Sequence, residues 1–195
     1  MAKTLHLCDF DGTLTRGDSL LHFLWFVVPL PRLVVGGLRL SFKFLGLLLS
    51  GKWSNGTAKA AVLAVYLEGK TRSELQTFGE AFCLQKLPAI LRTALLNQLQ
   101  RAQQSGETVV IVSASPHLWL EPFCRAMGFG LICTELSYES DIFRGQFATP
   151  NCNGPEKARR ILAAFDLRSF DLIIAYGNSS GDAAMFDLAH KVLKF

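Results

Sequence analysis

The sequence predicts an α/β protein with a doubly wound, mostly parallel sheet, an inserted all-helical lobe and a small β-hairpin. Short apolar runs alternate with segments of helical character, which is typical of a parallel sheet covered by helices. One long stretch, 19–106, contains no strand pattern and separates the first strand from the second. Several apolar runs end abruptly in polar residues, and ligands of open α/β sheets bind just beyond the carboxyl ends of strands.

The first strand is expected at 5–8, and it ends in Asp9, Asp11 and Gly12. Side chains alternate along an extended chain, so Asp9 and Asp11 would lie on the same side if the chain stayed extended. Two carboxylates at such a short distance repel each other unless a proton or a cation lies between them. Mg²⁺ suits such a place, because it prefers carboxylate and phosphate oxygens. A strand followed by an ordinary Asp-Gly turn fits these few residues equally well.

Composition favours a compact protein. The chain has 195 residues, of which 50% are hydrophobic and 18% charged, with a net charge of +4. This length supports one core and a small second lobe, and the composition disfavours disorder. Five cysteines without metal-ligand spacing indicate a reduced, cytoplasmic chain, and Cys8 and Cys133 are expected to be small buried residues. No signal peptide is recognised at the N-terminus.

The stretch that follows the first motif is unusually apolar. Asp18 or Ser19 is expected to cap a helix that starts at Leu20, and Pro29 and Pro31 are expected to break it. Basic residues keep every apolar run below the ~18 residues of a membrane-spanning helix, so none is predicted. All charged side chains between residues 19 and 67 are basic, namely Arg32, Arg39, Lys43, Lys52 and Lys59.

Two interpretations of this stretch stay open. Basic residues among Trp, Phe and Leu suit an interfacial surface, so 20–53 is a candidate for peripheral contact with the inner face of the membrane. Alternatively, the stretch is a helical lobe with a buried apolar face and solvated basic residues. Further helices are expected over 57–68, 71–86, with a Thr71–Glu74 capping box, and 88–105. Residues 19–106 would then form a lobe or cap over the end of the sheet.

The second half alternates strands and helices. Strands are expected at 108–112, 131–134, 172–176 and 192–195, a hairpin at 136–147 with its turn near Ser140–Asp141 and Gly145, and helices at 116–127, 155–165 and 183–188. In the helix from Pro155, residues Ile161, Leu162 and Phe165 are expected to face inward.

Polar residues follow the strands of this half as well. Ser113, Ala114 and Ser115 offer a hydroxyl and free N–H groups that can hold phosphate, although serines cap helices everywhere. The positive charge of Lys157 near the start of a helix interacts unfavourably with the helix dipole, so an anionic partner for this lysine is favoured. A solvated lysine is nevertheless the more frequent outcome at such a position. Asp182 could simply be an N-cap. The strand ends at Asp9, Ser113 and Asn178 nevertheless converge on one edge of a parallel sheet.

These motifs, in this order and spacing, resemble the haloacid dehalogenase (HAD) superfamily of hydrolases, in its phosphoserine-phosphatase-like branch with a helical cap (subfamily IB-like). The segment Asp9-Phe10-Asp11-Gly12-Thr13 looks like the first motif, Ser113 the second, Lys157 the third and 177–182 the fourth. The resemblance covers nearly the whole chain and implies a HAD-like Rossmannoid core over 1–18 and 107–195, with the cap at 19–106. It is greatest to a bacterial group of small phosphatases that are phosphoserine-phosphatase-like or phosphatidylglycerophosphatase-like.

The resemblance also implies roles for individual residues. Asp9 would be the nucleophile that forms an aspartyl-phosphate, and Asp11 the general acid and later the base. Phosphate would be bound by Phe10, Asp11, Ser113, Ala114 and Lys157. Mg²⁺ would be held by Asp9, Asp11, Asn178 and Asp182. The fourth motif usually opens with Asp, and Asn178 in that position predicts weaker Mg²⁺ affinity.

The expected function is a cytoplasmic, Mg²⁺-dependent phosphomonoester hydrolase acting on a small metabolite such as phosphoserine. A phosphatase of a lipid phosphate at the membrane surface is the alternative, and a non-catalytic module that binds phosphate or a partner is a third hypothesis. An acidic side chain would be needed to bind the amino group of phosphoserine. The segment 19–67 contains no acid, although Glu68, Glu74 or Glu80 could serve. Nucleic-acid binding is not expected, because the basic residues lie among aliphatic ones. The sequence predicts no particular oligomeric state.

Overall fold

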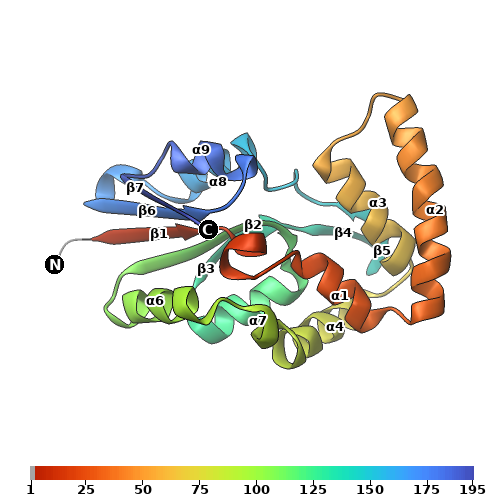
Figure 1. Cartoon of the computed structure of the whole chain (residues 1–195), viewed down its shortest axis with the longest axis horizontal. Coiled ribbons are helices and arrows are strands. Elements are labelled where there is room, and N and C mark those ends of the chain that lie inside the picture. The colour runs from red at the N-terminus through yellow and green to blue at the C-terminus, as the bar shows by residue number, and fades with distance from the viewer. Residues whose placement is uncertain (1–2) are drawn as a thin grey trace.

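The computed structural model describes residues 3–195 and is built on a five-stranded parallel sheet (Figure 1). The strand order is β3-β2-β1-β6-β7, so the first strand lies at the centre. The bounds are β1 (Thr4–Cys8), β2 (Thr108–Pro116), β3 (Gly130–Thr134), β6 (Leu172–Gly177) and β7 (Lys191–Lys194). The predicted α/β fold with a mostly parallel sheet is confirmed.

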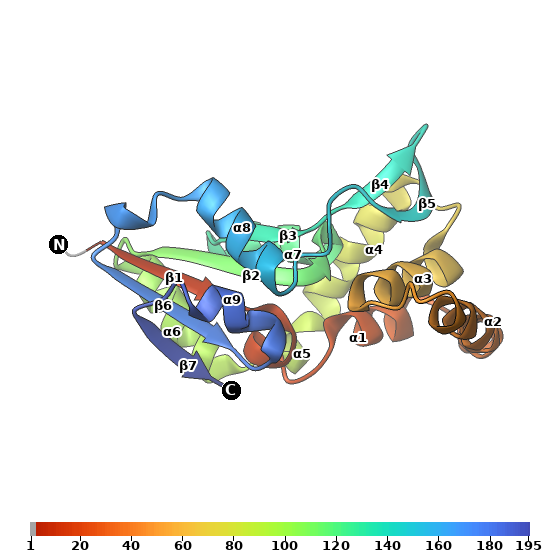
Figure 2. The same cartoon turned by 90° about the horizontal axis from the view of Figure 1, so that it is seen from above.

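Helices cover both faces of this sheet (Figure 2). One face carries α8 (Pro155–Ala164) and α9 (Ala183–Phe186), and the other carries α6 (Thr93–Gln104) and α7 (His117–Met127). The alternation along β1 explains this arrangement. Leu5 and Leu7 join a buried cluster with Ile161 of α8, whereas Cys8 joins the cluster that includes Leu99 of α6 and Phe123 of α7. Both sides of the central strand are therefore buried.

The predicted helical insertion follows β1. A single helical turn, η1 (Phe10–Leu14), leads into α1 (Ser19–Val27), α2 (Leu30–Leu49), α3 (Asn55–Leu67), α4 (Arg72–Gln85) and α5 (Leu87–Ile90). Asp18 caps α1 by accepting hydrogen bonds from the N–H groups of Leu20 and Leu21. Pro29 separates α1 from α2, and the Thr71–Glu74 capping box starts α4, both as predicted.

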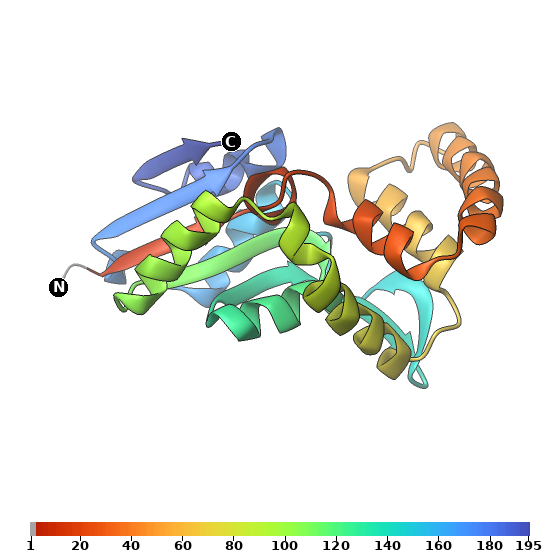
Figure 3. The ribbon, with the colours of Figure 1, turned by 60° about the horizontal axis from the view of Figure 1, so that its bottom comes forward.

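The helical insertion is divided in space (Figure 3). Helix α4 packs along α7, which covers one face of the sheet, and α6 packs directly against β2. Helices α2 and α3 pack on each other and project beyond the end of the sheet. The predicted hairpin, β4 (Leu136–Glu139) and β5 (Ile142–Phe147), lies against α3, where a Cβ on Gly145 would stand 2.5 Å from the Cβ of Ala64. The division into core and cap at residue 106 stays a prediction.

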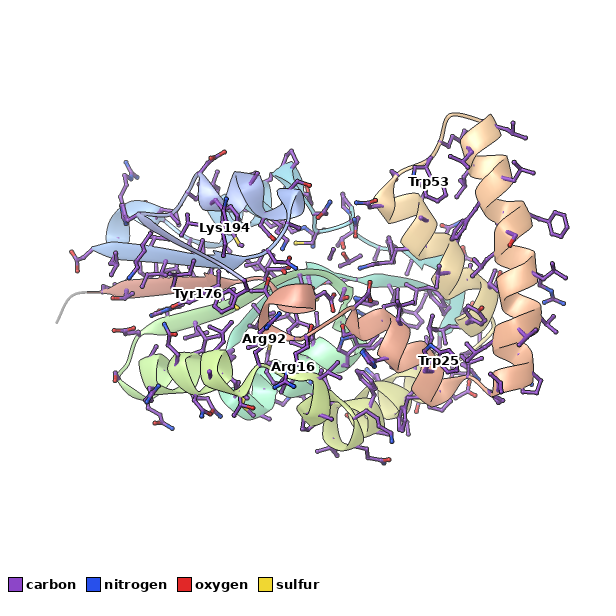
Figure 4. The ribbon with its side chains drawn as sticks, viewed as in Figure 1. Arg16, Trp25, Trp53, Arg92, Tyr176 and Lys194 are labelled. Atoms are coloured by element: carbon purple, nitrogen blue, oxygen red, sulfur yellow. The ribbon has the colours of Figure 1, made fainter. Side chains whose placement is uncertain are left out.

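Some local predictions were wrong. The helix expected over 88–105 is two helices, because Leu91 is extended and pairs with Thr15, and the N–H of Arg92 donates to the carbonyl of Leu14. This break ties the chain to the turn after β1, and Figure 4 shows Arg92 and Arg16 beneath that turn.

Further differences concern single residues and ends of elements. Leu162 on α8 is exposed, since Ile161 takes the position that faces the sheet. Gly145 lies within β5, whereas the turn is made by Ser140 and Asp141. Helix α9 ends at Phe186 rather than reaching residue 188.

Candidate active site

The predicted polar residues meet at the carboxyl edge of the sheet. Asp9 directly follows β1, Ser113 lies in β2, and the loop 178–182 follows β6. Because β1 is hydrogen-bonded to both β2 and β6, the three strand ends are neighbours. Helix α8 brings Lys157 to the same edge, where its amine contacts Asp9. Residues separated by almost the whole chain therefore share one small volume.

Lys157 joins two carboxylates. Its Nζ lies 2.6 Å from Oδ1 of Asp9 and 2.7 Å from Oδ1 of Asp182, and all three side chains are buried. Burial lowers the pKa of Lys157, but the charges of Asp9 and Asp182 outweigh this effect and leave its pKa raised. The ammonium group therefore stays charged at the sheet edge. Lys157 is therefore not the solvated lysine of the alternative interpretation, and its anionic partners include two acids of the chain itself.

Asp9 is held by two donors. Thr13 Oγ1 donates to its Oδ2 at 2.9 Å, and Lys157 donates to its Oδ1. Burial raises the pKa of Asp9 further than the charge of Lys157 lowers it, so the net pKa is raised. A buried carboxylate fixed in this way, with a shifted pKa and a cation beside it, is typical of a reacting group.

Asp182 organises the loop after β6. Its Oδ2 accepts hydrogen bonds from the N–H groups of Asn178 at 3.1 Å and Ser179 at 3.0 Å, and from the Ser179 hydroxyl at 3.1 Å. Burial raises the pKa of Asp182, but Lys157 and these donors outweigh it, and the pKa is lowered. The side chain does not cap α9. It instead fixes both the loop and the ammonium group of Lys157.

Asp11 turns toward other partners. Its Oδ1 accepts a hydrogen bond of 2.7 Å from the N–H of Ser19, and its Oδ2 accepts one of 2.5 Å from the Ser115 hydroxyl. The chain leaves the extended conformation within η1, where Gly12 has a φ of +78°. The prediction that Asp9 and Asp11 lie on the same side applied to an extended chain, and in the structure the two carboxylates have different partners. Asp11 is fixed between the start of α1 and the end of β2.

The end of β2 presents its own polar groups. Ser113 is buried, and its Oγ accepts a hydrogen bond from the N–H of Ser115. The carbonyl of Ala114 accepts hydrogen bonds from Lys59 of α3 at 3.2 Å and from the Thr134 hydroxyl at 3.1 Å. The predicted phosphate-binding segment is thus linked directly to α3.

A cavity of about 290 Å³ lies at this link between α3 and the core. Its lining includes Asp18, Asn55, Lys59, Ala114, Asn151 and Asn153. Asp18 brings a carboxylate to the cavity, whereas Glu68, Glu74 and Glu80 do not line it. The side chain of Phe10 lies away from it, packed edge-on against Phe123, so only the backbone of Phe10 is free for a phosphate.

Sequence reasoning missed Ser115, Lys59 and Asp18 as site residues. Ser115 belongs to the same polar run as Ser113, at the end of the same predicted strand. Its position two residues after Ser113 is the sequence signal that could have identified it. In the sequence, Lys59 is one of several basic residues between positions 19 and 67. No local pattern shows that α3 reaches the end of β2.

The oxygen donors at the edge fit a hard divalent cation. Asn178 lies against the first motif, since a Cβ on Gly12 would stand 2.1 Å from its Nδ2. The Asp9 carboxylate, the Asp11 carbonyl and the Asn178 amide are the kind of oxygen ligands that Mg²⁺ prefers. Within residues 3–195, no three His, Cys, Asp or Glu side chains gather as a metal cluster. This donor set suits Mg²⁺ held partly by neutral oxygens and not a soft transition metal.

Comparisons with known proteins identify the family and the fold of the chain. Residues 7–187 match the family model of haloacid dehalogenase-like hydrolases. "Protein CicA" of Caulobacter vibrioides is 34% identical over 185 residues, which cover 93% of this chain and 81% of that protein. A protein of unknown function from Bordetella pertussis Tohama I superposes with a TM-score of 0.77 at 21% identity, covering 98% of this chain and 89% of that one. A substrate-bound phosphoserine phosphatase superposes with a TM-score of 0.65 at 14% identity, and the superposition covers 100% of this chain and 87% of that one. Both structures share the fold.

Proposed function

This chain belongs to the family of haloacid dehalogenase-like hydrolases, and from that premise we propose that it hydrolyses a phosphomonoester through a phosphorylated Asp9. The observation that carries the proposal is the buried Asp9–Lys157–Asp182 arrangement beside Ser113 at one edge of the sheet. A carboxylate nucleophile, a fixed cation and a hydroxyl with backbone N–H groups are what transfer of a phosphoryl group requires.

In the proposed first step, an Oδ of Asp9 attacks phosphorus and the bond between phosphorus and the ester oxygen breaks. Lys157 offsets the negative charge that Asp9 and the phosphoryl oxygens bring together. Ser113 and the N–H groups near Ala114 bind phosphoryl oxygens. Bound Mg²⁺ would be held by Asp9, the Asp11 carbonyl and Asn178, with Asp182 nearby, and would supply shielding between the carboxylate and the phosphate.

Asp11 moves the protons in this scheme. Its carboxyl group gives a proton to the leaving alkoxide, and it then takes one from the water that attacks phosphorus. That second step releases inorganic phosphate and restores Asp9. The hydrogen bonds from Ser19 and Ser115 hold the Asp11 carboxyl group in place between these transfers.

The proposed substrate is a small phosphorylated metabolite. The cavity beside Ala114 is small and lined by polar side chains, which favours a compact polar leaving group. Asp18 offers the acid that an amino group such as that of phosphoserine would need, although the carboxylate also caps α1. This supports phosphoserine more than the sequence did.

A lipid phosphate is the second candidate. The observation in its favour is the large exposed apolar surface of α2, which is flanked by basic residues. The catalytic groups contact only the phosphoryl group, so they serve either substrate equally.

A panel of soluble and lipid phosphomonoesters, assayed with and without Mg²⁺, tests the proposal. We expect Mg²⁺-dependent release of phosphate, with p-nitrophenyl phosphate as the generic substrate. Asp9→Asn should abolish turnover, and Asp171→Asn, an exposed acid at the opposite end of β6, should keep it. Full activity in Asp9→Asn, or no hydrolysis of any ester by the folded protein, would contradict the proposal and favour a binding module.

A further inference from the structure

We propose that the outer face of α2 binds the surface of a lipid bilayer that contains anionic lipids. By the outer face of α2 we mean Val34, Leu38, Phe42, Leu45 and Leu49, together with Trp25 of α1. This proposal concerns binding alone and does not depend on the phosphatase activity. None of the helices within residues 3–195 is long and apolar enough to cross a membrane, so α2 would lie in the plane of the interface.

Exposed apolar side chains are concentrated on this part of the molecule. Most of the large apolar residues that are exposed within 3–195 belong to the segment 21–53. Phe42 is 71% exposed, Leu38 65% and Trp25 68%. So many exposed apolar side chains on one helix are unusual for a protein that contacts only water, and they indicate an interaction site.

The packing of α2 explains why these residues point outward. Its inner side lies on α3, where the ring of Tyr66 packs against Gly36 and its hydroxyl donates to the carbonyl of Leu33. Residues spaced by three, four and seven share a helix side, so Leu38 and Leu45 lie on the opposite side from Gly36 and Leu40. Figures 1 and 2 show α2 as the outermost helix, with no other element over its far side.

Charge identifies the kind of surface that fits. Arg32, Arg39 and Lys43 are spaced by seven and four, so they form one basic edge along the apolar face. In the described part of the chain none of the three takes part in an ion pair. The segment between residues 19 and 67 contains no acid that could neutralise them. Each such basic residue adds to the attraction toward anionic lipid.

A groove beside the basic edge suits a lipid headgroup. Arg32 and Arg39 line a cavity of about 430 Å³ between α2 and α3, together with Val28 and Tyr66. Guanidinium groups bind phosphate oxygens through charged hydrogen bonds. An anionic headgroup can therefore lie against these arginines while its acyl chains meet the apolar face. A second copy of this chain fits less well, because it would bring a second basic edge.

Exposed tryptophans lie near both ends of α2, although Trp53 packs edge-on against Phe44, on the side of α2 that also carries Leu40. Figure 4 shows Trp25 near the end of α1 and Trp53 where the chain passes from α2 to α3, and both are exposed. Tryptophan is enriched at the boundary between lipid and water. Helix α3 lies between this surface and the cavity that contains Lys59 and Ala114, so the candidate active site is one helix away from the proposed lipid contact.

Vesicle sedimentation tests the proposal directly. Vesicles of phosphatidylcholine alone are compared with vesicles that contain about one third phosphatidylglycerol. We expect the protein to bind the anionic vesicles, and the double variant Leu38→Glu/Phe42→Glu to lower the partition coefficient at least about tenfold. Leu84→Glu on α4, where the leucine is 78% exposed, is the matched control and should bind like the parent. Arg32→Glu/Arg39→Glu should remove the preference for anionic vesicles.

Fluorescence gives a second measurement on the same samples. Brominated lipids should quench Trp25, which belongs to the proposed face, while Trp119, which is fully buried, should be unaffected. Circular dichroism confirms that each variant is folded. The proposal is overturned if the protein binds neither type of vesicle, or if Leu38→Glu/Phe42→Glu binds as the parent does. It is also overturned if that double variant abolishes self-association while the parent ignores vesicles, since the face would then join two copies.

Discussion

Replacing Lys157 with methionine removes the charge between two buried carboxylates and shortens the unbranched side chain by only one atom. The Nζ atom lies 2.6 Å from Asp9 and 2.7 Å from Asp182, and no more than 10% of any of the three side chains is exposed. Removing one partner of a buried ion pair costs about 3–5 kcal/mol, because the other charge is left uncompensated. Here two carboxylates remain, and they also repel each other. We expect the free energy of unfolding at neutral pH to fall by about 3–5 kcal/mol.

The pH dependence of this loss is the more specific prediction. Without Lys157, burial and mutual repulsion raise the pKa of one carboxyl group above its unfolded value. A raised pKa means that the folded variant binds more protons than the unfolded chain. The loss of unfolding free energy in Lys157→Met is therefore complete above the raised pKa. This loss shrinks as the pH falls through that pKa toward about 4, the pKa of an aspartate in the unfolded chain.

Urea unfolding over a range of pH, in the absence of Mg²⁺, measures this effect. Trp119 is the natural probe, because it is buried against Phe23 with ring centroids 4.7 Å apart. Arg159→Met is the matched control, since Arg159 lies on the same helix and pairs with Glu156 at the surface. It should destabilise the protein much less than Lys157→Met, because exposed ion pairs contribute little to stability. A Lys157→Met deficit equal to that of the control, or one that stays constant with pH, would refute the reasoning.

The remaining predictions concern the turn after β1, the loop after β6 and the start of α8. Gly12→Ala should destabilise the protein somewhat more than Gly106→Ala in thermal unfolding. Both glycines have φ near +80°, but only a Cβ at Gly12 would have to push the side chain of Asn178 aside, and equal losses would contradict that contact. Asn178→Asp should tighten Mg²⁺ binding about tenfold by calorimetric titration, because it adds a negative charge; an unchanged affinity would refute the proposed ligand. Hydrogen bonds from neighbouring arginines, chiefly Arg159, lower the pKa of Glu156 to about 2. Its stabilising contribution, about 1 kcal/mol, should be complete above about pH 4.5 and lost as the pH falls toward 2; unfolding curves of Glu156→Gln that track the parent throughout would contradict it.

Much of the fold could be predicted because its signals are local. The apolar runs before Asp9, Ser113 and Asn178 predicted parallel strands, and the carboxyl ends of neighbouring parallel strands share one edge. The convergence of these residues follows from that geometry. Lys157 joined them through the helix that starts at Pro155, and the structure shows two carboxylates as its partners.

The rest could not be predicted, because it depends on contacts between segments far apart in the sequence. Lys59 reaches Ala114 only because α3 is placed over the end of β2. The break at Leu91 arises from its pairing with Thr15, which no helix signal encodes. Helix α2 is apolar on more than one side, so its sequence alone left open which side is buried. The contact of Tyr66 with Gly36 decides that side.

Identifying the phosphorylated residue tests the central claim most directly. The protein is mixed with substrate and Mg²⁺, quenched in acid and digested, and its peptides are weighed by mass spectrometry. The account predicts a gain of one phosphoryl group on the peptide that contains Asp9, and no gain in Asp9→Asn. Turnover without any labelled peptide, or a label on a residue other than Asp9, would contradict it.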